Sequence, residues 1–98
     1  MSLRLVVRPE ADAEFIEAQV WYESRREGLG ARFAAAVDAH MVRVLATPLA
    51  FPCVHGATRR AVMTSFPYAV YYQVVSEEIV VLAIMHGSRH PRLWRSRH

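Results

Sequence analysis

The residues best suited to chemistry gather in the C-terminal stretch 86–98, which carries a histidine at its start, a tryptophan and four arginines (Arg89, Arg92, Arg95 and Arg97). Arginine binds phosphate through a planar fork of N–H donors. A histidine such as His86 exchanges protons near neutral pH, and an aromatic ring such as Trp94 can stack on a base. This pattern indicates nucleic-acid contact, or RNA cleavage with His86 as acid or base. The alternative is an Arg-rich terminus whose Trp94 packs back on the rest of the domain.

A second candidate site is the pair Arg59-Arg60. Consecutive side chains of a strand point to opposite faces of a sheet, so one of the two arginines should reach a face that helices do not cover. There it could bind phosphate or carboxylate. The plainer interpretation, which the residue types favour, is two solvated arginines that protect an edge strand from pairing with another chain.

The remaining reactive residue types indicate no cofactor and no metal site. Cys53 is the one cysteine of the chain, so an internal disulfide is excluded, and no Cys/His cluster has zinc spacing. We expect Cys53 to be a partly buried, unreactive thiol, and His40 and His55 to be structural. A Gly-rich phosphate loop and a carboxylate cluster are both missing from the sequence.

The charge is unevenly distributed along the 98 residues, whose net charge is +3. The first fifty residues hold six Arg and seven acids, whereas the rest holds six Arg and two acids, Glu77 and Glu78. Every cation is arginine, which favours phosphate or carboxylate partners but also fits a GC-rich genome. With 53% hydrophobic residues and no apolar run of about 18–20 residues, we expect a cytoplasmic protein with one domain, 1–98, and a basic tail at 87–98.

Two helices are predicted in the first half. A short apolar run at 3–7 is typical of a strand, and Pro9 then opens a segment with apolar residues at helical spacing, which predicts a helix over 9–27. Gly28 and Gly30 make a tight connection to a second amphipathic helix that Pro48 ends. The short connection predicts an antiparallel helical hairpin.

The second half predicts strands. We expect a loop over 49–57, strands at 58–63, 68–75 and 79–85, and a hairpin turn at 76–78. Within 68–75, Tyr68 and Tyr72 should share one sheet face and Tyr71 the other. The order β-α-α-β-β-β predicts an α+β fold, in which an N-terminal strand and a helical hairpin pack on an antiparallel sheet of about four strands.

Three stretches together resemble the RelE/ParE toxin superfamily, and especially its ParE-like, plasmid-stabilisation branch. They are 11–22 (ADAEFIEAQVWY) with Gly28-Leu29-Gly30 and Phe33; 48–60, with Phe51-Pro52 and the Arg pair; and Phe66-Pro67-Tyr68, Tyr71-Tyr72, the apolar strand and the ending His86, Arg89, Pro91 and Trp94. The resemblance covers almost the whole chain. It implies a helical hairpin against an antiparallel sheet, in agreement with the residue patterns.

The resemblance also implies a function, that of the toxin in a type II toxin–antitoxin system. ParE-like toxins poison DNA gyrase and RelE-like toxins cut messenger RNA in the ribosomal A site; a small antitoxin, whose C-terminal segment wraps the toxin, neutralises both kinds. The long helical hairpin and the His-x-x-Arg-x-Pro-x-x-Trp ending resemble the ParE branch. The resemblance therefore implies growth arrest through gyrase inhibition, with the following target-binding residues: Arg59, Arg60, Arg89, Arg92, Trp94 and Arg95.

Two alternatives stay open. One is a RelE-like, ribosome-dependent messenger RNA endonuclease with His86, Arg89 and Arg60 as catalytic residues, although the lysines of that branch have no counterpart here because the chain has no Lys. The other is an inactive relative that only binds an antitoxin. In each case the expected partner is a cognate antitoxin, in a toxin–antitoxin hetero-oligomer. We expect it across the helical hairpin and the sheet edge, because the hairpin is apolar and its first helix acidic.

Overall fold

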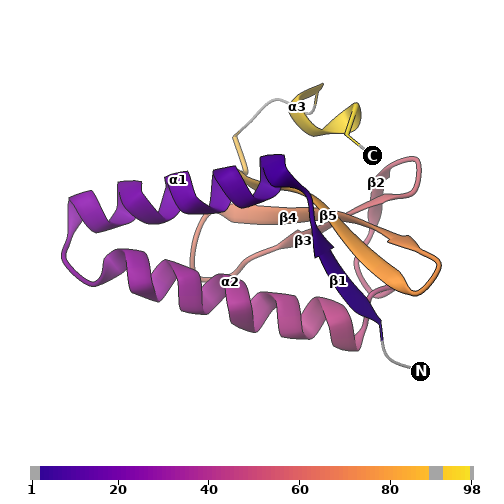
Figure 1. Ribbon diagram of the computed structural model, residues 1–98, viewed down its shortest axis with the longest axis horizontal. Helices are drawn as coiled ribbons and strands as arrows, with labels where there is room; N and C mark the ends of the chain where they lie inside the picture. Colours follow the sequence, from indigo (N-terminus) through magenta and orange to yellow (C-terminus); the bar gives the residue numbers. More distant parts are fainter. Residues whose placement is uncertain (1–2, 89–91, 98) are drawn as a thin grey trace.

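The computed structural model describes residues 3–88 and 92–97, and it confirms the predicted α+β class (Figure 1). The chain forms eight elements in this order: β1 (Arg4–Val7), α1 (Pro9–Arg25), α2 (Leu29–Ala46), β2 (Cys53–His55), β3 (Thr58–Val62), β4 (Tyr68–Val75), β5 (Glu78–His86) and α3 (Arg92–Arg95). Two differ from the sequence prediction. The short strand β2 lies inside the stretch expected to be a loop, and the basic tail contains the one-turn helix α3.

The sheet has five strands in the order β1-β5-β4-β3-β2, and it is mixed rather than wholly antiparallel. Strands β2 to β5 pair antiparallel, whereas β1 lies parallel to β5, from Arg4 opposite Glu78 to Val7 opposite Val81. The direction of β1 follows from long-range pairing, since the N–H of Arg8 reaches the carbonyl of Val81 at 2.9 Å. A four-residue apolar run does not encode that choice.

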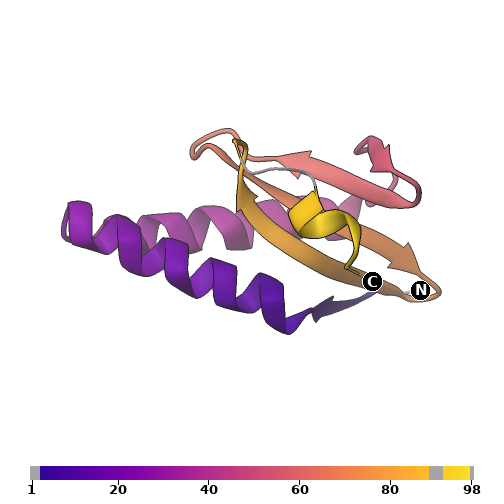
Figure 2. The ribbon, with the colours of Figure 1, turned by 90° about the horizontal axis from the view of Figure 1, so that it is seen from above.

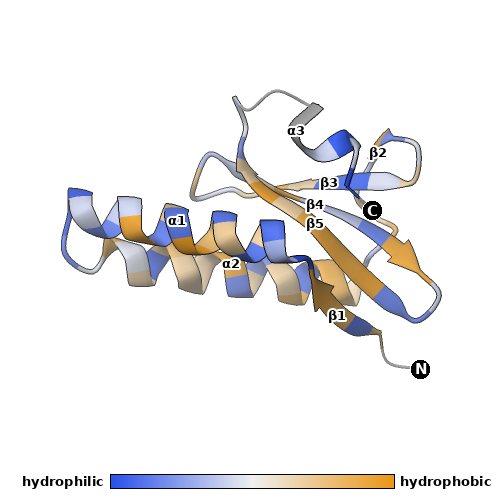
Figure 3. Cartoon of the chain, turned by 45° about the horizontal axis from the view of Figure 1, so that its top comes forward, coloured by the Kyte–Doolittle hydropathy of each residue, from blue (hydrophilic) through white to orange (hydrophobic). Residues whose placement is uncertain are grey.

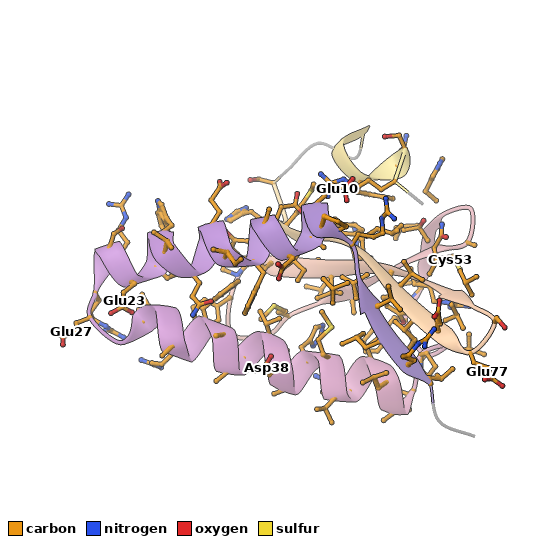
Figure 4. The ribbon with its side chains drawn as sticks, viewed as in Figure 1. Glu10, Glu23, Glu27, Asp38, Cys53 and Glu77 are labelled. Carbon is orange, nitrogen blue, oxygen red and sulfur yellow. The ribbon has the colours of Figure 1, made fainter. Side chains whose placement is uncertain are left out.

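The turn between the two long helices is held by a carboxylate from α1. Glu23, which Figure 4 labels near the turn between the helices, accepts hydrogen bonds from the backbone N–H groups of Gly28 and Gly30, both at 2.9 Å. Gly28 has a left-handed φ of 85°, which favours glycine. A Cβ on Gly30 would lie 2.7 Å from the carbonyl oxygen of Gln19, so α2 begins in direct contact with α1.

The main core lies on the side of the sheet that α1 and α2 cover, which we call the helix face. Phe33, Val37 and Val44 of α2 are buried there against sheet residues that include Val70, Tyr72, Ile79 and Val81. The ring of Phe33 stands 5.1 Å from those of Tyr22 and Tyr68 and 5.2 Å from that of Phe66. His40 is buried in the same layer with its Nε2 3.0 Å from the carbonyl oxygen of Ala61, which confirms its structural role.

The opposite side of the sheet, which we call the open face, carries a much smaller cluster. Its buried members are Ala69, Tyr71, Ala83, Met85 and Trp94. Figure 2 shows α3 lying over the strands on this side, and Figure 3 shows the hydropathy of β4 and β5 beneath it. Tyr71 belongs to this cluster, whereas Tyr72 and Tyr68 pack on the helix face, as predicted.

Two further observations complete the fold. Cys53 is exposed on the edge strand β2, in contrast to the partly buried thiol expected from its Pro-Cys-Val context. Within residues 3–88 and 92–97, no helix has the length and apolarity to cross a membrane.

Candidate functional site

The C-terminal segment is fixed to the open face by Trp94. This side chain is 3% exposed and stacks on Tyr71 with ring centroids 4.4 Å apart and planes at 22°. Of the two possibilities considered from the sequence, the structure has the one in which Trp94 packs back on the domain. Its ring is therefore occupied by the contact with the sheet. Its neighbour Arg95 is exposed, with the guanidinium carbon 6.0 Å from the Trp94 ring centroid. Helix α3, which Trp94 holds in place, thus presents the exposed guanidinium of Arg95.

A second attachment joins the segment to α1 and β5. The Nη1 of Arg97 donates to Oε1 of Glu14 at 2.9 Å and to the carbonyl of Leu82 at 3.1 Å. The same Glu14 oxygen accepts the N–H of Ile84 at 3.1 Å. Because β1 ends opposite Val81, the edge of β5 beyond it needs other partners for its backbone groups, and these two side chains supply them. Sequence reasoning did not predict this role of Glu14. The available signal was that Glu14 is an acidic residue on the side of α1 that faces inward.

The arginine pair divides between the two faces as predicted. Arg59 lies opposite Tyr72 on the helix face, and its Nη1 donates to the carbonyls of Phe51, at 2.6 Å, and Leu49, at 3.3 Å. It therefore holds the segment between α2 and β2. Arg60 lies opposite Tyr71 on the open face and is exposed, so this arginine can reach a partner.

His86 lies at the far end of β5 and turns toward the helix face. Its ring is 5.5 Å from that of Tyr68, and its Nδ1 accepts the backbone N–H of Ser88 at 3.1 Å, with the Ser88 hydroxyl at 2.8 Å. The structure therefore places His86 and Arg60 on opposite faces and does not bring them together. Arg89, the third expected catalytic residue, lies outside the described residues, as does the side chain of Arg92.

The open face gathers one histidine that sequence reasoning took for structural. His55 is exposed on β2 with its ring 6.2 Å from that of Trp94. His55 and Arg95 lie beside the Trp94 ring, and Arg60 is paired with Tyr71, so these three exposed side chains lie near the buried Trp94–Tyr71 stack. Nowhere in the described part of the chain do three His, Cys, Asp or Glu side chains come close enough to hold a metal ion.

A groove opens between α1, the start of β4 and the end of β5. Its volume is about 480 Å³, and the residues that line it are Glu14, Glu17, Ala18, Trp21, Tyr22, Pro67, Tyr68, Ile84, Met85, His86 and Ser88. Burial raises the pKa of Tyr22 above its ordinary value, so the neutral phenol persists to higher pH than it would in water. Three aromatic rings, two carboxylates and the imidazole of His86 thus line the groove.

Comparison with known proteins gives two findings. Residues 5–91 match the family model described as "ParE toxin of type II toxin-antitoxin system, parDE". A solved chain from the "Chromosomal ParDE TA system from P. aeruginosa" superposes with a TM-score of 0.65 at 16% identity, over 87% of this chain and 96% of that chain, which shows a shared fold. Among curated proteins, the sequence comparison gives no match.

Proposed function

Because the chain belongs to the ParE toxin family of type II toxin–antitoxin systems, we propose that it arrests growth by inhibiting DNA gyrase and that a cognate antitoxin neutralises it. The family match over residues 5–91 is the observation that carries this proposal. The ParDE name of the structural relative supports an antitoxin of the ParD kind as partner. A gyrase inhibitor acts where the chromosome lies, so we place its action in the cytoplasm.

The open face is the proposed surface for the target. Arg60 and Arg95 are exposed there, and Trp94 holds α3 so that Arg95 stays in position. Arg89 and Arg92, from the same basic stretch, are proposed to extend this surface. We assign Arg59 a supporting role, because its guanidinium already holds the carbonyls of Leu49 and Phe51.

Controlled expression in a bacterium, with two readouts, tests the proposal. We expect growth arrest with loss of gyrase supercoiling and with DNA damage signalling, while messenger RNA in translating ribosomes stays intact. Arrest with cleaved message that is lost in His86→Ala would instead identify a ribonuclease. A folded protein that causes no arrest but binds the antitoxin would be an inactive relative.

Variants of the arginines locate the target surface. Since a hydrogen bond to a charged group contributes about 1.5–3 kcal/mol, Arg60→Ala and Arg95→Ala should each weaken gyrase inhibition by about tenfold or more. Arg43→Ala is the matched control, because Arg43 is an exposed arginine in the last turn of α2, on the other layer. Truncation after Gly87 should abolish arrest and leave the antiparallel strands β2 to β5 folded. Equal loss in Arg43→Ala would mean that net charge, rather than this surface, matters.

A further inference from the structure

The acidic and basic residues of the chain lie in different parts of the fold. The helical hairpin, residues 9–46, holds seven acids and four arginines, whereas residues 47–98 hold two acids and six arginines. Figure 4 labels four of the hairpin acids, from Glu10 to Asp38. Five of the seven belong to α1, which packs on β5, two strands away from β3 in the sheet. Since β2, β3 and β4 hold no acid, the part of the sheet that they form is electropositive.

The open face presents cations that no acid neutralises. Arg60 on β3 and Arg95 on α3 are both exposed, and among residues 3–88 and 92–97 no carboxylate forms an ion pair with either one. Arg97, by contrast, is paired with Glu14. The exposed imidazole of His55 on β2 is a further group that can donate an N–H to an oxyanion. Three elements of the open face thus present donors that remain available for an anionic partner.

The aromatic rings of the open face are buried, which narrows the kind of anionic partner. Tyr71 is 4% exposed and Trp94 is 3% exposed, and the two rings stack on each other. Single-stranded nucleic acid is usually bound by exposed rings on which bases stack, and protein interfaces usually have aromatic anchors. The exposed large apolar residues of β3 and β4 are instead two valines, Val62 and Val75. Contacts to the phosphates of a duplex require cations and no exposed ring, so a duplex fits this surface best.

We propose that the open face binds the phosphate backbone of duplex DNA through Arg60, Arg95 and His55, without reading the base sequence. The preference for the phosphates of a duplex rests on the unpaired cations and the buried rings. The choice of DNA rests on the proposed function, because gyrase holds duplex DNA while it acts. The toxin therefore contacts DNA as well as gyrase. Independence from sequence follows because phosphate contacts fix position and carry no base information.

Fluorescence anisotropy with the full chain, in the absence of gyrase, tests this contact directly. The probes are two fluorescein-labelled DNA duplexes of about 24 base pairs and unrelated sequence, at about 50 mM salt. We expect both to bind with a Kd of roughly 10–100 μM, as in non-specific DNA binding. The logarithm of the affinity should fall with the logarithm of the salt concentration with a slope of about −2 to −3, since each phosphate contact contributes about −0.9. A single strand of the same sequence should bind at least about threefold more weakly.

Variants locate the contact on the protein. Arg60→Ala and Arg95→Ala should each weaken duplex binding about three- to tenfold and make the salt slope shallower by about 0.9. Arg60→Lys should retain most of the affinity, because a phosphate contact depends mainly on charge. Arg43→Ala is the matched control: it removes one exposed arginine from α2, on the other layer, and should change the affinity by less than about twofold. Circular dichroism confirms that each variant is folded.

A supercoiling assay on the same proteins separates this contact from the proposed function. Duplex binding that Arg60→Ala weakens, by a protein that does not inhibit gyrase, supports the contact and contradicts the proposed function. Gyrase inhibition without duplex binding, or equal losses of duplex binding in Arg43→Ala and Arg60→Ala, overturns the contact. Tighter binding of an RNA duplex of the same sequence overturns the assignment to DNA. Binding to gyrase alone that Arg60→Ala abolishes, with no binding to the free duplex, assigns the surface to an acidic protein and also overturns the inference.

Discussion

The two faces of the sheet carry buried clusters of very different size. On the helix face, thirteen buried residues form one continuous cluster; they come from two long helices, from three strands and, in the case of Met63, from the segment just after β3. On the open face, a cluster of five is closed by a single side chain, Trp94, from a helix of four residues. The first face has enough apolar contact to hold the domain together, whereas the second has enough to position one short segment.

This difference separates the sources of stability and of function. The helix face determines whether the chain folds, because most of its buried apolar side chains lie there. The open face and the outer side of α1 are where charged and apolar groups remain available to other molecules. Changes on the first should therefore lower global stability, and changes on the second should loosen local attachments or weaken binding.

The largest effect is expected from Phe33→Ala. Phe33 is fully buried and contacts Tyr22, Phe66 and Tyr68, so its removal should lower the free energy of unfolding by about 3–5 kcal/mol. That is a large part of the total of about 5–15 kcal/mol typical of a domain. Urea unfolding followed by circular dichroism measures it. A loss below about 1 kcal/mol would contradict the assignment of stability to the helix face.

Trp94→Ala is the counterpart on the open face. It removes the stack on Tyr71, but α3 is a single turn near the end of the chain and can detach without unfolding the sheet. The global loss should therefore be about 1–2 kcal/mol, well below the roughly 3–5 kcal/mol of a buried tryptophan in a closed core. Proteolysis after Arg95 or Arg97 should accelerate strongly. A global loss equal to that of Phe33→Ala would show that both faces form one cooperative core.

Sequence patterns predicted the helix face better than the open face, for a physical reason. Apolar spacing defines α1, α2 and the strands, and the predicted span of β4, Tyr68–Val75, is the observed one. Those patterns report which side of an element is buried. They do not report long-range pairing, so the parallel direction of β1 and the short strand β2 were not predicted.

The candidate sites show the same limit. Their residue types were visible in the sequence, but their positions depended on the sheet. Strand alternation correctly separated Arg59 from Arg60, because that rule is local. The separation of His86 from Arg60 and the contact of Glu14 with Arg97 arise between segments far apart in the chain. Composition gave no signal for either.

Glu14→Gln tests the contact through which α1, on the helix face, holds the C-terminal segment, which lies on the open face. The amide retains an acceptor for the N–H of Ile84 but loses the charge that attracts Arg97, so the attachment of the C-terminal segment should weaken by about 1 kcal/mol. Hydrogen exchange of amides 94–97 should speed up about fivefold, with little change in the strands. Glu17→Gln, on the same helix, should leave that exchange unchanged. Equal exchange in both variants would mean that Trp94 alone holds the segment.

The smallest effect concerns pH and Tyr72, on the helix face. Burial raises the pKa of Tyr72, which the charge of Arg59 partly offsets, and its hydroxyl donates to the carbonyl of Pro48 at 2.5 Å. Since the unfolded chain loses this proton near pH 10 and the folded chain at higher pH, the contribution to stability is present below about pH 10 and is lost above it. Tyr72→Phe should cost about 1 kcal/mol at pH 7, and this difference should shrink as the pH rises through 10–11. Urea unfolding at pH 7, 9, 10 and 11 measures the two curves. A constant difference would mean that the hydroxyl is open to water, and the helix face would then be less tightly closed at the Pro48 end than its buried residues indicate.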